Sequence, residues 1–409
     1  MKISRRVLLG TSLIAAALPI GAVRAQTPDI PVAFIAPLSG PWARGGENLR
    51  RGAELAVEDI NKDGGIKALG GAKLRLVVAD AGDTPDKARN AIQRLLAENP
   101  SLVAGTGAWL SSFTLAITEV TERAGLPWFT NSFSDQITDR GFKNVFQTVV
   151  IGSKQAEQLL PALTKLSEAA TGKKATTIGV LTDNTPAPTS MLKPLRDGGF
   201  EAAGLKLVVD RTFTPPLTDA TALVQAVRAA RPEMLFMPST STQDNKLLIE
   251  KLSEFGLGQG KLPVIGASGT LVVPEVLNLL GKEGVEGVMT ILAAWPTKEN
   301  AELVERFKAR FKESWMTSDS IETYGHIQLI KTALEKSGVG RADAINAALR
   351  ALDIKDGAAA YFPGHRVRFD EKGRRIDAEL VVVQWQGGQP VLVYPTEFAA
   401  AKPRWGTAR

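Results

Sequence analysis

The chain has 409 residues, of which 44% are hydrophobic and 22% are charged, a composition typical of a globular protein with room for two domains. The formal net charge of +6 would suit a nucleic-acid-binding protein. However, four of the 49 basic residues and none of the 43 acidic ones lie in the first 25 positions. The rest of the chain carries a charge of about +2 with no basic stripe, so we expect no nucleic-acid partner.

The first 25 residues have the pattern of an export signal. A positively charged start precedes the short apolar run Val7–Ile20, and the small residues before Gln26 predict cleavage after Ala25. The segment Ser4–Leu9 resembles a twin-arginine signal, and a general secretory signal is the alternative. The apolar run is too short for a membrane anchor and contains Pro19. Because the chain has no Cys that a lipid could modify, we expect an exported, periplasmic protein.

A strand, a loop and a helix open the mature chain. The apolar run Ile30–Ala36 predicts a strand, and a loop of Pro, Ser and Gly follows it. Apolar residues over Leu49–Ile60 recur with the 3.6-residue period of a helix, which Gly64-Gly65 ends. Open α/β proteins bind small ligands where a strand leads through such a loop into a helix N-terminus.

Strand and helix patterns alternate along most of the remaining chain, which predicts parallel sheets covered by helices. The predicted strands are 74–79, 102–104, 127–130, 177–181, 205–209, 234–237, 263–265 and 285–291. The predicted helices include 87–98, 115–123, 220–230, 246–255 and 301–315. From Val367 the pattern changes to short strands joined by turns at 371–373 and 386–388. We expect a loosely held tail after Pro395.

The sequence offers little chemistry for catalysis. Its two His, His326 and His365, lie in unrelated contexts, and the absence of Cys leaves no clustered metal-ligand spacing. No nucleophile elbow, P-loop or dinucleotide fingerprint is present. We interpret His326, which lies in a helical pattern, as a structural or surface residue. We therefore expect no enzyme activity, no cofactor and no metal.

Short motifs follow one another in a definite order and spacing along the mature chain, over 36–66, 80–88, 103–105, 111–112, 124–127, 131–134, 263–266, 285–288 and 364–373. Together they resemble the periplasmic binding proteins of the branched-chain amino acid and amide transport family, which are receptors of ABC importers. The family often carries a disulfide in its mature region. Gly82 and Leu110 stand at the two matching places, so that bond is absent here.

The resemblance implies a type I periplasmic binding protein fold, in which two doubly wound α/β lobes are joined by three crossover segments and close on a ligand by a hinge. It places the signal peptide at 1–25, the first lobe at 29–149 plus 296–361, the second lobe at 150–295 plus 362–395, and a C-terminal tail at 396–409. The three crossings would lie near 149–152, 293–296 and 361–363.

In the first lobe, the resemblance implies that hydroxyl groups hold a ligand carboxylate. Ser111 matches the family's carboxylate-binding Ser, and Ser112 follows it. Both precede an apolar-periodic segment and suit a helix N-cap, where an anion would meet free N–H groups; ordinary capping is the alternative. The neighbouring contacts to carboxylate and amine would come from the segment formed by Ser132, Phe133 and Ser134.

The rest of the expected pocket differs from that of the amino-acid binders. Trp42, in the first loop, would stack on the ligand or serve as a surface or hinge aromatic. The family acid that pairs with a ligand ammonium matches Ser268, and two pocket Tyr match Ala187 and Thr240. Because a buried ammonium without a carboxylate is costly, either another acid such as Asp183 replaces it or the ligand has no ammonium. Asp183 could equally cap a helix.

These features predict an extracytoplasmic solute receptor that binds a small carboxylate, amino acid or amide in a cleft between the lobes and delivers it to an ABC importer. We expect a carboxylate or amide rather than leucine, permease subunits in the inner membrane as partners, and a monomer. A ligand-sensing module for a chemoreceptor or sensor kinase would need the same fold and is the alternative. The scarcity of His and the lack of Cys disfavour an exported enzyme.

Overall fold

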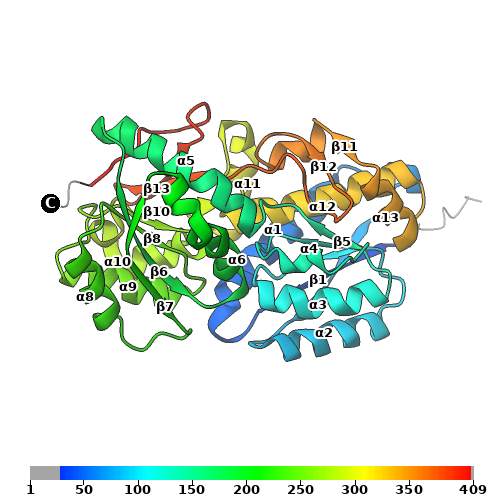
Figure 1. The fold of residues 1–409 in the computed structure, drawn as a ribbon. Helices are drawn as coiled ribbons and strands as arrows, with labels where there is room; N and C mark the ends of the chain where they lie inside the picture. Colours follow the sequence, from blue (N-terminus) through cyan, green and yellow to red (C-terminus); the bar gives the residue numbers. More distant parts are fainter. Residues whose placement is uncertain (1–27, 407–409) are drawn as a thin grey trace, which may run out of the picture.

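A computed structural model describes residues 28–406 and shows two α/β lobes side by side (Figure 1). The expected export signal and its cleavage after Ala25 lie outside the described residues. Within 28–406, no helix has the length and apolar character needed to cross a membrane.

The first lobe is built on a five-stranded parallel sheet in the order β2-β1-β3-β4-β5. Its strands are β1 (Ile30–Ala36), β2 (Leu74–Asp80), β3 (Gly105–Thr106), β4 (Trp128–Thr130) and β5 (Val145–Gln147). Its helices are α1 (Ala43–Lys62), α2 (Pro85–Glu98), α3 (Ser111–Arg123), α4 (Gln136–Asp139), α11 (Ala301–Phe311), α12 (Ser318–Ser337) and α13 (Ala342–Arg350). Strand β5 is not among the strands predicted from the sequence, and it is only three residues long.

The central strand β1 shows why this lobe needs helices on both faces. Every residue of β1 is buried, and successive side chains point to opposite faces of the sheet. Val32 and Phe34 join the core under α1 and α12, whereas Ala33 and Ile35 join the core under α2 and α3. A continuous apolar run of this kind is the sequence pattern of a parallel strand that is covered on both sides.

The second lobe contains a seven-stranded sheet in the order β14-β13-β10-β9-β8-β6-β7. Its strands are β6 (Thr177–Asp183), β7 (Lys206–Phe213), β8 (Met234–Met237), β9 (Val264–Gly266), β10 (Met289–Leu292), β13 (Val381–Gln386) and β14 (Gln389–Tyr394). The main covering helices are α5 (Gly152–Thr171), α6 (Pro186–Pro194), α8 (Thr221–Ala230), α9 (Thr242–Glu254) and α10 (Pro274–Val285), with the short α7 (Phe200–Ala202) beside them. The last two strands form a hairpin whose turn has Gly387 and Gly388 at φ 63° and 81°, as predicted for a two-residue turn.

The chain passes between the lobes in three places, and the third differs from the sequence expectation. Phe362 and Phe369 lie in the core of the first lobe, as does the short strand β12 (Val367–Arg368), which pairs with β11 (Asp353–Ile354). The backbone N–H of Arg375 still donates to the carbonyl of Gln147 in β5. We therefore place the third crossing at 376–380 rather than at 361–363.

Helix α12 is the most deeply buried helix of the first lobe. In the N-terminal half of α12, hydroxyl-bearing and charged residues are buried together with the apolar ones, and tertiary hydrogen bonds fix the helix. Ser320 Oγ donates to the carbonyl of Asn48 in α1 at 2.8 Å. The two ring nitrogens of His326 lie 2.8 Å from the hydroxyls of Thr106 and Thr148, so His326 is a structural residue inside the core. Burial lowers the pKa of His326 to about 3, which keeps the ring neutral.

Two expectations near the C-terminal part of the chain are wrong. The helix predicted at 301–315 ends at Phe311, and Trp315 instead reaches the second lobe, where its Nε1–H donates to the carbonyl of Val272 at 2.8 Å. The tail expected to be loosely held is docked on the second lobe. Its Arg404 N–H donates to Gln384 Oε1 at 2.8 Å, and Trp405 packs against the lobe's core.

Contact between α1 and α12 requires a glycine at position 52, because a Cβ there would overlap the backbone carbonyl of Ser320. We expect Gly52→Ala to lower the free energy of unfolding by about 1–3 kcal/mol through overpacking. Denaturant unfolding measures the change. The control is Gly340→Ala, where the nearest atom would lie 3.8 Å away. Equal stability of the two variants would contradict the close packing described here.

Candidate functional site

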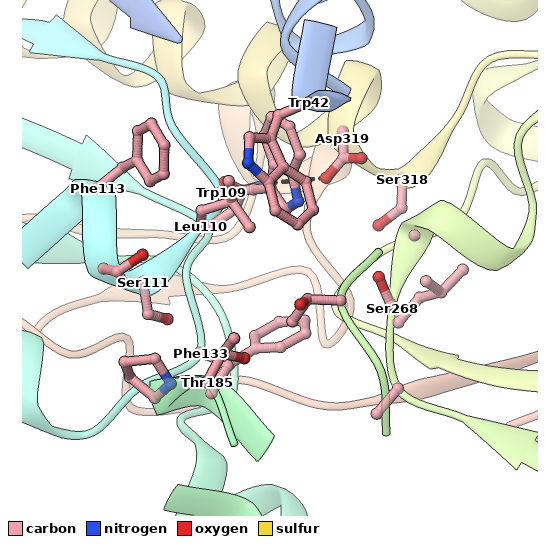
Figure 2. Close-up of a pocket in the computed structure, with 18 of the residues that line it drawn as sticks. Trp42, Trp109, Leu110, Ser111, Phe113, Phe133, Thr185, Ser268, Ser318 and Asp319 are labelled. Carbon is pink, nitrogen blue, oxygen red and sulfur yellow. Dashed lines mark hydrogen bonds between the residues drawn. The ribbon is translucent and has the colours of Figure 1, made fainter. Parts of the chain in front are cut away.

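A pocket lies between the lobes, at the carboxyl ends of strands from both sheets (Figure 2). It encloses about 720 Å³ of space, counting its open mouth. The loops after β1, β3 and β4 supply the first wall, and the loops after β6, β8 and β9 supply the second. Its lining residues include Trp42, Trp109, Ser111, Ser112, Phe113, Asn131, Phe133, Thr185, Pro186, Ala187, Thr240, Ser268, Gly269, Ser318, Asp319 and Glu322. This position is the general one for ligands of open α/β sheets.

Ser111 and Ser112 line the pocket at the N-terminus of α3. The N-cap residue is Leu110, so the expectation that these serines cap the helix is wrong: Ser111 is its first residue. The hydroxyl of Ser111 accepts the backbone N–H of Ser134 at 3.2 Å. N–H groups in the first turn of a helix have no partner within the helix, so this end of α3 offers donors to an anion.

Ser132 and Ser134 do not line the pocket, although the neighbouring Phe133 does. The Ser132 hydroxyl lies 2.8 Å from the carbonyl of Trp109 and 2.7 Å from the hydroxyl of Thr114. The Ser134 hydroxyl lies 3.2 Å from that of Ser190 in α6, which belongs to the second lobe. Alternation along this extended segment turns the ring inward and the two hydroxyls away, where they join loops to one another.

Asp183, at the end of β6, fixes two loops of the second wall. Its Oδ1 accepts the N–H and hydroxyl of Thr185 at 2.8 and 2.6 Å. Its Oδ2 accepts the N–H and hydroxyl of Thr240 at 2.7 and 2.8 Å. Four donors thus occupy a carboxylate that is 1% exposed and does not line the pocket, whereas Thr185 and Thr240 do. The structure favours this supporting role over that of an ammonium partner.

Ser268 lines the pocket and completes the second wall. Its hydroxyl accepts the N–H of Thr270 at 3.2 Å and lies 2.7 Å from the Thr270 hydroxyl. This position carries no charge, as the sequence indicated.

Two acids that the sequence analysis did not select, Asp319 and Glu322, line the pocket from the first lobe. They lie in the first turns of α12, where acids are common for helix stability, so their positions gave no separate functional signal. Asn131 Nδ2 donates to both, 3.1 Å from Asp319 Oδ1 and 3.1 Å from Glu322 Oε2. Burial raises the pKa of Asp319 to about 7 and, together with the Asp319 charge, that of Glu322 to about 8.

Aromatic rings supply much of the remaining lining. Trp42 lines the pocket, together with Trp109, Phe113 and Phe133, and Figure 2 shows the indoles of Trp42 and Trp109 at its upper edge. Trp109 lies over Gly45 of α1, where a Cβ would overlap the indole ring. Such a lining can bury an apolar or aromatic part of a ligand between two polar ends.

The two lobes contact each other around the pocket. Arg44 Nε of α1 lies 2.7 Å from Glu275 Oε1 of α10, and Arg44 Nη2 lies 2.9 Å from Glu313 Oε1. A Cβ added at Gly269 of the second lobe would lie 3.0 Å from Asp319 Oδ2 of the first. The lobes therefore approach closely enough for both to touch one small ligand. Within the described residues, no group of three or more His, Cys, Asp and Glu side chains is placed to hold a metal ion.

Comparisons with known proteins agree with this architecture. A family model described as periplasmic binding protein matches residues 29–389. The Leu/Ile/Val-binding protein homolog 8 of Brucella suis is 30% identical over 417 residues, covering 99% of this chain and all of its own. The Leu/Ile/Val-binding protein homolog 7 of the same organism is 29% identical over 402 residues, covering 96% of this chain and 98% of its own.

Solved structures share the fold at lower identity. A branched-chain amino acid transporter substrate-binding protein of Streptococcus pneumoniae, in complex with isoleucine, is 19% identical with a TM-score of 0.73, over 89% of this chain and 99% of its own. An ABC transporter solute-binding protein of R. palustris, in complex with benzoate, is 19% identical with a TM-score of 0.74, over 93% and 98%. These likenesses confirm the predicted fold class of two doubly wound lobes.

The support that Asp183 gives to both loops can be tested without a ligand. We expect Asp183→Ala to lower the free energy of unfolding by about 2–4 kcal/mol, because four donors lose their acceptor in a buried site. Hydrogen exchange should also accelerate in peptides containing Thr185 and Thr240. In the control Asp86→Ala, the native side chain is 88% exposed and both quantities should stay near the parent values. Unchanged exchange at the two loops would contradict the role assigned to Asp183.

Proposed function

We propose, from the fact that this chain belongs to the periplasmic binding protein family, that it is an extracytoplasmic receptor which binds a small carboxylate-bearing ligand between its lobes and delivers it to an ABC importer. Proteins of this family, including the relatives compared above, are substrate-binding proteins and not enzymes. The observation that carries the proposal is the pocket itself, which loops from both sheets line at the carboxyl ends of their strands.

The carboxylate end of the ligand would lie against α3. Ser111 and Ser112 line the pocket there, and the first-turn N–H groups together with the helix dipole favour a negative group. The solved relatives add a chemical argument, since isoleucine and benzoate share a carboxylate and differ in the ammonium group. The proposed contacts are Trp42, Ser111, Ser112, Phe133, Thr240 and Ser268, to which we add Trp109, Asn131, Asp319 and Glu322.

The expectation of a ligand without ammonium rested on the uncharged Ser268, and it left open that another acid, with Asp183 as the best candidate, pairs with an ammonium. Asp319 and Glu322 line the pocket and supply two further acids for that alternative. Amino acids are therefore candidate ligands, together with simple carboxylates and amides.

Delivery to an importer and ligand sensing predict different phenotypes for cells that lack this gene. Uptake of a labelled ligand by cells that lack this gene would fall if the protein serves an importer. A sensing module would leave uptake intact and abolish the behavioural or transcriptional response. We propose the importer role, with inner-membrane permease subunits as partners and a periplasmic monomer as the working form.

Ligand binding can be tested by thermal unfolding with L-leucine, L-phenylalanine, 4-methylpentanoate, 3-phenylpropanoate, benzoate and the amide of each acid. A ligand at one hundred times its Kd stabilises by about 2.7 kcal/mol, so we expect at least one compound to raise Tm by roughly 5 °C. Trp42→Ala should weaken its binding about tenfold, because the ligand loses a buried aromatic contact. Phe398→Ala removes a ring that is 42% exposed and outside the pocket, and should leave binding unchanged. If no compound in the panel binds, the proposed function is wrong.

A further inference from the structure

Building on the proposed receptor function, we propose that Asp319, Glu322 and Asn131 form the recognition site for a protonated nitrogen of the ligand, so that the preferred ligand carries both a carboxylate and an N–H cation. The acid for this cation then lies in the first lobe, on α12, instead of at position 268 in the second lobe. This assignment narrows the substrate class of the pocket described above.

The three side chains present acceptors that the protein does not satisfy. Asn131 is 4% exposed and lines the pocket, and its Oδ1 has no hydrogen-bond partner among the described residues. The Nδ2 group of Asn131 donates to both acids, so its Oδ1 is left without a hydrogen-bond partner in the part of the chain that the structure describes. Within the described chain, the bond from Asn131 is the one hydrogen bond that each carboxylate accepts. A buried acceptor without a donor is costly, so the site calls for a ligand that brings N–H groups.

The charged groups that the structure describes around Asp319 and Glu322 do not supply the N–H donors that these carboxylates lack. Arg375 is the cation that acts on Glu322. Its Nε donates to the carbonyl of Thr148 at 2.7 Å and its Nη1 donates to that of Pro363 at 2.7 Å, so its hydrogen bonds go to backbone carbonyls. His326 lies one turn further along α12 and is neutral, because burial lowers its pKa. From the second lobe, the uncharged Gly269 faces Asp319.

The shape of the pocket suits a ligand with two polar ends. In the view of Figure 2, Ser111 and Asp319 lie on opposite sides of the opening, with the indole of Trp109 between them and Phe133 lower in the view. An anion would meet the α3 N-terminus on one side, and a cation would meet the acids on the other. A quaternary ammonium would satisfy the charge but offer no N–H donor to the carboxylate oxygens of Asp319 and Glu322. We therefore assign a primary or secondary ammonium, or a related N–H cation.

Binding of the ligand ammonium is coupled to the release of a proton from the pair formed by Asp319 and Glu322. Near neutral pH the unliganded pair holds a proton, since the pKa values of Asp319 and Glu322 are raised to about 7 and about 8. When the ammonium binds, the ionised carboxylate is favoured and a proton leaves to solvent, while the ligand nitrogen keeps its own. Affinity therefore rises with pH up to about 8, and a single linked proton with pKa near 7 changes Kd about tenfold between pH 6 and 8.

Matched ligand pairs test the site. L-leucine and 4-methylpentanoate differ by the amine alone, as do L-phenylalanine and 3-phenylpropanoate. Calorimetric titration at pH 6, 7 and 8 should show the amine-bearing member binding at least about tenfold tighter, with a Kd that falls about tenfold over this range. Repeating the titration in buffers of different ionisation enthalpy should show a proton release that falls from about 0.9 per amine bound at pH 6 to about 0.1 at pH 8. The deaminated member should show neither effect.

Asp319→Asn and Glu322→Gln keep side-chain shape and remove charge. Each should weaken the amine-bearing ligand at least about tenfold and flatten its pH dependence, while leaving the deaminated ligand within about threefold of the parent. Asp86→Asn, at an exposed position, is the control and should change nothing. Circular dichroism and Tm verify folding, and the two variants provide independent tests. Equal affinity within a matched pair, or amine binding that neither substitution weakens, would overturn this site and leave the receptor function standing. Failure of every compound to bind would overturn both.

Discussion

Burial of α12 is the constraint on which the rest of the first lobe depends. The helix packs so closely on α1 that Gly52 cannot carry a side chain, and His326 joins the ends of β3 and β5 through Thr106 and Thr148. This packing places Asp319 and Glu322 at the pocket, although water would solvate their charges better. The cost of burying these acids is offset elsewhere in the lobe, which is a common arrangement at binding sites.

The two walls of the pocket differ in the charge of the groups that line them. In the first wall, acids and a helix N-terminus supply opposite charges over a short distance. In the second wall, Thr185, Thr240 and Ser268 supply neutral hydroxyls. The charged side chains that line the pocket therefore belong to the first lobe. The Arg44–Glu275 pair and the approach of Gly269 to Asp319 then describe the arrangement with both walls in place.

The sequence predicted the fold more fully than the site, for a physical reason. Strand β1 and the helix after it were clear because burial on fixed faces imposes a periodic pattern on neighbouring residues. Ser111, Ser112 and Phe133, which the family resemblance selected, line the pocket. Asp319 and Glu322 could not be distinguished from ordinary acids near the start of a helix, since only tertiary packing turns them toward the pocket. Trp315 and Trp405 were missed likewise, because their partners lie far away in the sequence.

The carboxylate of Asp183 has a consequence for how fast the protein can capture its ligand. By holding Thr185 and Thr240 through four hydrogen bonds, it orders the second wall when the chain folds rather than when the ligand arrives. Loop ordering then contributes little to the activation barrier for association. Diffusion into the opening remains as the main step that governs the on-rate.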